Sequence, residues 1–271
     1  MSFSPLNRYL LPFGRALSGG PDTYFARTVL GGGEPFLPFA INFTMPRKKV
    51  TKSGILPYHI WARSNNREMF NLPTEKMWTI CVEQLFNVTI AYGLRVHAFT
   101  LMGNHFHLLA STPFSNLGSV MTYFMRETSK KANFDTNRIN HLFGSRYKAS
   151  LIDDFYHYFN VYRYVYQNPL RAGMVKSVEL YPYSTISVLF GQSPIVLPLF
   201  PSTFDFRDPL MADPESCLKW LNRIPNLSSD RAVAKGLTKT TYSLPIEKST
   251  RKAFQYLPED LREINALLKR R

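Results

Sequence analysis

Alternating and helical hydrophobic patterns follow one another between residues 55 and 168, after a first segment that has neither period. Four short runs rich in β-branched and aromatic residues are typical of strands, and they span residues 55–63, 94–102, 105–111 and 145–153. Gly103-Asn104 separates the second run from the third. This pair of residues predicts a turn, so the two runs are expected to form a hairpin.

Three segments have apolar residues at the 3.6-residue spacing of an amphipathic helix. The first begins at Pro73 and ends at Gly93, and the second has its apolar stripe between Leu117 and Thr128. The third runs from about Phe155 to Asn168, and we expect Pro169 to break it because proline lacks a backbone N–H.

The order of these elements is strand, helix, strand, strand, helix, strand and one further helix. It favours an α+β fold, a ferredoxin-like antiparallel sheet with helices on one face plus an extra C-terminal helix. Residues 45–190 would form this domain. Residues 1–44 are rich in Gly, Pro and Phe and predict a poorly ordered N-terminal tail.

Residues 191–271 form a basic C-terminal extension that is expected to be mostly helical or irregular. Short helical patterns occur at Pro214–Ile224 and Pro258–Arg271, after a Pro-rich link. Such short helices hardly build an independent core. Two roles stay open for this extension: it could add positive charge to a binding path, or it could cover an apolar face of the domain.

The charge balance changes the functional picture. Lys and Arg number 33 against 19 Asp and Glu, which gives a formal net charge of +14. This indicates an anionic partner, with nucleic acid first and an acidic membrane surface second, although a merely basic protein is also compatible with it. No apolar run approaches 18 residues, so we expect no membrane span. Two distant cysteines and the lack of a secretory signal favour a reduced, intracellular location.

The third strand contains two histidines around one phenylalanine. His105 and His107 are two residues apart, so they project from one face of the strand while Phe106 points to the other. Two imidazoles on a rigid strand make a good pair of ligands for one divalent ion. The plainer alternative is a pair of hydrogen-bonded histidines in a polar corner.

The third helix adds polar groups at helical spacing. Tyr164 and Asn168 are four residues apart, so they lie one above the other on a single helix face. The other tyrosines of this helix are interpreted as packing residues. Cationic residues that could meet phosphates surround these motifs in the sequence: Arg126, Lys130, Lys131, Arg146, Lys148 and Arg171.

The segments "LMGNHFHLL" and "YVYQNPLRAGMV … YPYST" closely resemble the HUH (His-hydrophobic-His) single-tyrosine transposases. The resemblance is closest to the REP-associated tyrosine transposases, which are relatives of insertion-sequence elements that move as single-stranded DNA. It covers roughly residues 45–189, and "PYHIWARSNNREMF" and "HLFGSRYKASLI" fit the same pattern. Gly103 departs from it, because a proline often stands there, and residues 1–44 and the C-terminal part have no counterpart.

This resemblance implies a site and a reaction. His105, His107 and Asn168 would hold Mg²⁺ or Mn²⁺, and Tyr164 on the extra helix would be the nucleophile. The substrate would be single-stranded or hairpin DNA, cleaved through a 5′-phosphotyrosine adduct with a free 3′-hydroxyl and rejoined by the reverse reaction. The six cations would bind this DNA. A DNA transposition and recombination enzyme of this kind would be cytoplasmic and associated with the nucleoid.

Two alternatives stay open. A zinc or manganese hydrolase could use His97, His105 and His107, and it would need no tyrosine. A non-catalytic DNA-binding protein derived from a transposase is the other. The presence of both histidines, Tyr164 and Asn168 argues against the second alternative, since a chain that only binds DNA has no chemical need for all four.

Overall fold

A four-stranded antiparallel sheet forms the centre of the computed structural model, which describes residues 50–139, 141–190, 197–202, 204, 213–223, 227–246, 251, 262 and 264–266. The predicted tail at 1–44 lies outside these residues. The strands are β1 (Tyr58–Arg63), β2 (Arg95–Leu101), β3 (His105–Ser111) and β4 (Lys148–Leu151), arranged in the order β2-β3-β1-β4. This antiparallel order is that of a ferredoxin-like sheet, so the predicted α+β fold is confirmed.

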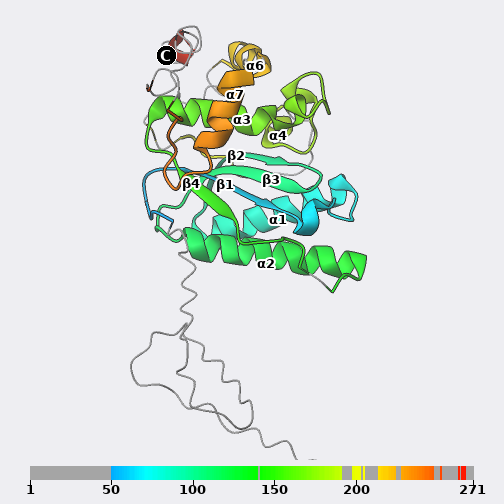
Figure 1. Cartoon of the computed structure of the whole chain (residues 1–271). Helices are drawn as coiled ribbons and strands as arrows, with labels where there is room; N and C mark the ends of the chain where they lie inside the picture. Colours follow the sequence, from blue (N-terminus) through cyan, green and yellow to red (C-terminus); the bar gives the residue numbers. More distant parts are fainter. Residues whose placement is uncertain are drawn as a thin grey trace, which may run out of the picture. The chain divides into compact units, whose positions relative to one another are not determined.

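Helices cover both faces of the sheet (Figure 1). α1 (Thr74–Tyr92) and α2 (Leu117–Thr136) pack on one face, where Phe99, Phe106 and Leu108 belong to the main core. α3 (Phe155–Arg171) packs on the opposite face against Ala98 and Leu109. The two domain helices therefore share one face, and the extra helix packs against the other.

The expectation that Pro169 breaks the third helix is wrong, because α3 continues through it to Arg171. Proline has no N–H for the carbonyl of residue i−4, which is Val165 here. The side-chain Nδ2 of Asn168 donates to the Tyr164 carbonyl at 2.7 Å and to the Val165 carbonyl at 3.4 Å. This amide satisfies the carbonyls around the proline. The helix ends at Arg171 with Ala172 as its C-cap, and Gly173 follows with φ at +69°.

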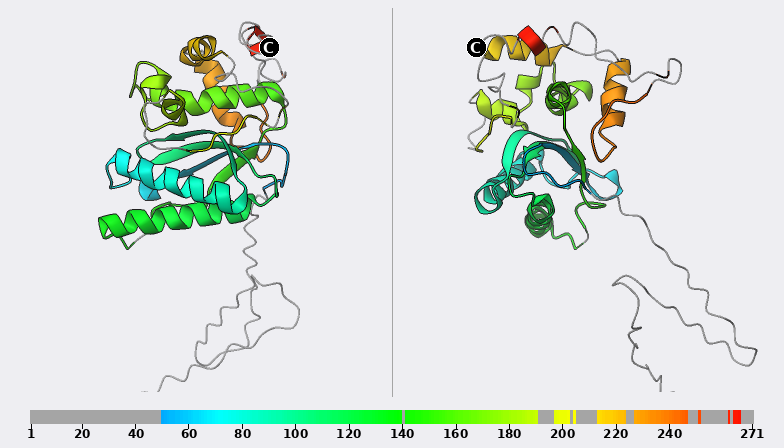
Figure 2. Two further views of the ribbon diagram at one scale, coloured as in Figure 1. Left: turned by 180° about the vertical axis from the view of Figure 1, so that it is seen from behind. Right: turned by 90° about the vertical axis from the view of Figure 1, so that its left-hand side faces the viewer.

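The described part of the C-terminal extension covers α3. α6 (Pro214–Asn222) lies on the side of α3 that faces away from the sheet (Figure 2). α7 (Leu227–Gly236) lies beside α3, and the segment after it reaches β4, where the Tyr242 N–H donates to the Leu151 carbonyl at 2.7 Å. Cys217, Trp220 and Leu221 of α6 are buried in the same cluster as the α3 side chains. α3 is thus packed between the sheet and the extension, which is why nearly every turn of it is buried.

The segment that contains "YPYST" supports the edge of the sheet. A 3₁₀ turn (Val178–Leu180) and α4 (Thr185–Leu189) flank this segment. The Leu101 N–H donates to the Tyr183 carbonyl at 2.9 Å, and the Phe99 N–H donates to Thr185 Oγ1 at 2.9 Å. These bonds occupy the otherwise open edge of β2 and fix it against α3, since Thr185 also contacts the Tyr166 hydroxyl at 3.0 Å.

Candidate active site

The paired histidines share one face of β3, as their spacing predicts. Their ring centroids are 5.1 Å apart and the rings are nearly perpendicular. Phe106 points to the other face, where its ring contacts the rings of Phe124 and Phe143 in the core. The apolar side chain between them therefore anchors the strand, and the strand holds both imidazoles on the α3 side of the sheet.

A third histidine, His59, joins this pair from the neighbouring strand. His59 Nε2 lies 3.0 Å from His107 Nδ1, and both side chains are buried. Sequence reasoning missed His59 because nothing local marks it. Only the register of β1 on β3, in which Trp61 faces His107 and Arg63 faces His105, carries His59 to the same face. The alternating pattern of β1 shows on which face of the strand His59 lies, but it does not show that His107 is its neighbour.

All three imidazoles are held neutral. Burial lowers the pKa of His59 to about 3 and that of His105 to about 4. Burial also lowers the pKa of His107 well below its usual range, and the neighbouring His59 and His105 add to the effect. A neutral ring is the form that binds a metal ion, so these environments favour coordination over protonation.

The hydrogen bonds of the pair fit a divalent ion. His105 Nδ1 contacts Asn104 Oδ1 at 2.7 Å, and His107 Nδ1 contacts His59, so both Nε2 atoms are available. Metal-binding histidines have this arrangement, with one ring nitrogen held by a partner and the other on the ion. Within the described residues no set of three His, Cys, Asp or Glu side chains with metal-binding geometry occurs. Further ligands would therefore be amide oxygens, water or phosphate.

Tyr164 lies over the histidine cluster. Its ring centroid is 5.5 Å from that of His107 and 5.9 Å from that of His59, and both contacts are edge-on. Burial raises the pKa of the Tyr164 hydroxyl, while the charges of Arg171 and Arg63 lower it. Tyr158, Tyr162 and Tyr166 of the same helix are no more than 1% exposed and pack in the core, whereas Tyr164 is partly accessible. Tyr156 is also partly accessible, but its hydroxyl bonds to Asn265, so Tyr164 is the partly accessible tyrosine of α3 whose ring contacts the histidines in the described part of the chain.

Asn168 lies one turn beyond Tyr164, as the sequence predicts. Its Nδ2 bonds to the helix backbone beside Pro169, so the amide presents Oδ1 as its remaining polar atom. An amide oxygen is a suitable ligand for a hard cation such as Mg²⁺. In the described part of the chain Asn168 makes no hydrogen bond to either histidine, and its role as a ligand stays a prediction.

Two arginines flank Tyr164 and the histidines. The Arg171 guanidinium lies 4.7 Å from the centre of the Tyr164 ring, and its Nε contacts Asp230 of α7 at 2.9 Å. Arg63 is opposite His105 in the sheet register, and its buried Nε has no hydrogen-bond partner among the described residues. Positive charge beside a tyrosine hydroxyl and a pair of neutral imidazoles is suited to a phosphate group.

The other predicted DNA-binding residues divide into two sets. Lys148 lies 4.7 Å from the centre of the Trp61 ring, and Trp61 is opposite His107, so Lys148 is on the site's face. Arg146 is exposed nearby in the chain, with its guanidinium 5.9 Å from the centre of the Tyr147 ring. In the part of the chain that the structure describes, neither Lys148 nor Arg146 forms a salt bridge with an acidic side chain.

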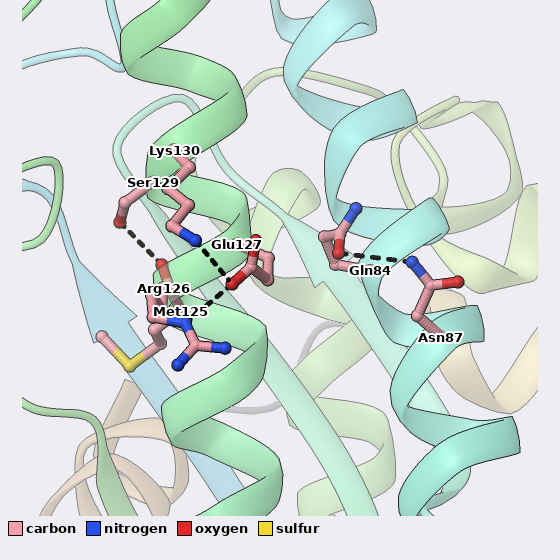
Figure 3. Close-up of polar contacts among 7 residues, drawn as sticks. All are labelled: Gln84, Asn87, Met125, Arg126, Glu127, Ser129 and Lys130. Atoms are coloured by element: carbon pink, nitrogen blue, oxygen red, sulfur yellow. Dashed lines mark hydrogen bonds and ion pairs between the residues drawn. The ribbon is translucent and has the colours of Figure 1, made fainter.

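The remaining three cations are on α2, in the layer on the opposite side of the sheet (Figure 1). Arg126 and Lys130 both contact Glu127, at 2.7 and 3.2 Å (Figure 3). Lys131 contacts Glu83 of α1. The structure therefore does not bring Arg126, Lys130 and Lys131 together with Tyr164, and each of the three contacts an acidic side chain, Glu127 or Glu83.

His97 is separate from the cluster. It is the extra residue of a bulge in β2, and its two ring nitrogens contact Ser111 Oγ at 3.1 Å and the Phe200 carbonyl at 3.0 Å. Ser111 ends the strand that His105 begins. Both nitrogens of His97 are thus engaged at the far end of β3, which does not favour the three-histidine hydrolase.

None of the helices in the described ranges is both long and apolar enough to cross a membrane.

Comparisons with known proteins give structural similarity alone. No family model matches the chain, and no curated protein matches it. Among solved structures, a REP-associated tyrosine transposase bound to a REP hairpin is similar with 19% identity and a TM-score of 0.45, over 59% of this chain and 93% of that one. A Deinococcus radiodurans R1 protein described as a transposase is similar with 14% identity and a TM-score of 0.31, over 55% and 97% of the two chains.

Proposed function

We propose that this protein cleaves and rejoins single-stranded or hairpin DNA, with Tyr164 as the nucleophile and a divalent Mg²⁺ or Mn²⁺ ion held by His105, His107 and Asn168. The observation that carries the proposal is the position of the Tyr164 ring, 5.5 Å from the ring of His107. A hydroxyl nucleophile, a pair of neutral imidazoles and two arginines meet at one place on the sheet. Their combined chemistry matches transfer of a phosphodiester to tyrosine.

The chain's own groups would bind and orient the scissile phosphate. Arg171 and Arg63 neutralise its charge, and Arg171 also keeps the Tyr164 ring in place by covering one side of it. A divalent ion at the histidines would polarise the phosphate and draw charge from it. The Tyr164 oxygen then forms a bond to phosphorus, the bond to the 3′-oxygen breaks, and the phenolic proton ends on that 3′-oxygen.

The sheet face next to the histidines offers a path for the strand. Trp61 and Lys148 follow His107 across β1 and β4 in the register of the sheet. An aromatic ring with a lysine can hold a base and its phosphate without reading its sequence. Duplex DNA would keep the phosphate away from an in-line position, so an unpaired strand is the expected substrate.

The proposal is tested by incubating the full chain with single-stranded hairpin DNA and Mn²⁺ and separating the products on a denaturing gel. A covalent adduct is expected with the wild type and no adduct with Tyr164→Phe. Tyr156→Phe is the matched control, because Tyr156 is on the same helix and bonds to Asn265 instead. DNA binding without any adduct in the wild type would contradict the proposal and favour the non-catalytic alternative.

A further inference from the structure

Two buried polar groups without partners lie directly beside the histidine pair. His59 Nδ1 and Ser150 Oγ are both buried, and neither has a hydrogen-bond partner among the described residues. His59 and Ser150 are opposite each other on β1 and β4, so their side chains project from the same face of the sheet. A buried polar atom that lacks a partner is costly, and two such atoms on facing residues are best explained together.

Ser150 can join its hydroxyl to His59 Nδ1 in two ways. A change of side-chain rotamer moves Oγ toward the ring, or one water bridges the two atoms. Ser150 would then contact His59 Nδ1, while His59 Nε2 already lies 3.0 Å from His107 Nδ1. The result is a chain of hydrogen bonds, Ser150–His59–His107, that leads from β4 through β1 to β3.

Such a chain can run in two directions. If Ser150 accepts from His59 Nδ1–H, then His59 Nε2 accepts from His107 Nδ1–H, and the lone pair of His107 is on Nε2. If Ser150 donates, every proton moves to the other nitrogen and His107 Nε2 carries hydrogen. Only the first arrangement leaves His107 able to bind a cation through Nε2.

We infer that Ser150 and His59 are positioning residues, which hold His107 in the tautomer with its proton on Nδ1 and its Nε2 lone pair exposed. The inference rests on the proposed metal site and adds what prepares that site before the ion arrives. Asn104 fixes the same tautomer in His105, because Asn104 Oδ1 can only accept a hydrogen bond and therefore requires a proton on His105 Nδ1. The two ligands are thus prepared by unrelated neighbours.

The first test needs neither metal nor variant. Nitrogen-15 chemical shifts of the histidine rings distinguish a protonated ring nitrogen from a bare one in the metal-free protein. We expect His107 to carry its proton on Nδ1 and His59 to carry its proton on Nδ1 as well. A His107 ring protonated on Nε2 would overturn the inference, whatever the activity of the protein.

The second test measures Mn²⁺ affinity by electron paramagnetic resonance in the full-length protein. His59→Phe keeps an aromatic ring but removes the acceptor, so it should weaken Mn²⁺ binding about 10–100-fold. His59→Gln retains an acceptor and should restore most of the affinity. Ser150→Ala should weaken binding about 2–10-fold, as the loss of one hydrogen bond would.

Matched controls separate positioning from general damage. His97→Phe replaces another buried, hydrogen-bonded histidine, and Thr128→Val removes another buried hydroxyl without a partner, on the opposite layer. His97→Phe should lower the melting temperature because it breaks two hydrogen bonds, and Thr128→Val should leave it unchanged or raise it because the lost hydroxyl has no partner in the described residues. Neither variant should change the Mn²⁺ affinity. Wild-type affinity in His59→Phe, or an equal loss in His97→Phe, would overturn the inference.

The inference and the proposed function can fail independently of each other. If Mn²⁺ binding depends on His59 as described but no DNA adduct forms, the inference stands and the tyrosine chemistry fails. If an adduct forms on Tyr164 while His59→Phe binds Mn²⁺ normally, the function stands and the inference fails.

Discussion

The ring of Tyr164 stands at 89° to the ring of His107, with the two centroids 5.5 Å apart. This contact joins α3 to β3, and it depends on the packing of α3 between the sheet and the C-terminal extension. A helix held on both sides has little freedom to slide, so the hydroxyl of Tyr164 keeps a fixed place beside the histidines. Such a fixed geometry is what in-line attack on a phosphate requires.

Replacing His107 should destabilise the fold more than replacing His105. His107→Gln and His105→Gln are each expected to abolish metal-dependent cleavage. His107 is 6% exposed and bonds to buried His59, so its replacement should also lower the free energy of unfolding by about 1–3 kcal/mol. His105 is only partly buried and bonds to its neighbour Asn104, so its replacement should lower the free energy of unfolding by less. Urea unfolding and a nicking assay on both variants test this, and full cleavage by either would contradict it.

Arg171 and Arg126 should behave differently toward DNA. Arg171→Gln removes a cation beside Tyr164, so it should weaken DNA binding and reduce the slope of log affinity against log salt by about 0.7–0.9. Arg126→Gln is the matched control, since this arginine lies on α2 and contacts Glu127 (Figure 3). Its slope should equal that of the wild type. Equal effects of the two substitutions would mean that DNA crosses the α2 layer as well.

Acid should destabilise the protein through its buried histidines. Burial lowers the pKa of His97 to about 4, below its usual value of 6.5. Between pH 6.5 and 4 the unfolded chain therefore binds more protons than the folded one, so stability is full above about pH 6.5 and is lost as pH falls toward 4. This single residue accounts for about 3 kcal/mol across that window. His97→Phe should flatten the dependence of unfolding free energy on pH there, and an unchanged slope would contradict the assignment.

The C-terminal extension should be required for folding. Trp220 of α6 is 3% exposed and contacts Phe159 of α3, and the Arg163 guanidinium lies 5.3 Å from the centre of its ring. Trp220→Ala should destabilise the protein by about 3–5 kcal/mol. A chain ending at Phe190 would expose the outer side of α3 and should lose its cooperative melting transition. A truncated chain that melts normally but binds DNA with a smaller salt slope would instead assign the extension to the DNA path.

The sequence predicts much of the fold because its periods are local. Alternation in β3 places His105 and His107 on one face, and the 3.6-residue period places Tyr164 and Asn168 on one side of α3. Pro169 misleads because its effect is cancelled by a side chain, the amide of Asn168, rather than by the backbone.

Features that depend on distant pairing could not be predicted. His59 reaches His107 only through the register of β1 on β3, and Asp230 reaches Arg171 only because α7 packs on α3. The three cations of α2 belong to the same domain as Tyr164, but they lie on the opposite side of the sheet from it. Closeness in the chain is therefore a poor guide to which charges share a site.

The identity of the attacking side chain can be read from the covalent complex itself. The covalent complex formed with hairpin DNA and Mn²⁺ is digested with protease and nuclease, and mass spectrometry locates the nucleotide on the peptide. We expect a phosphodiester on Tyr164, with none on Tyr156, Tyr162 or Tyr166, and no adduct when EDTA removes the metal. A nucleotide on another tyrosine of α3, or an undiminished adduct in EDTA, would contradict it.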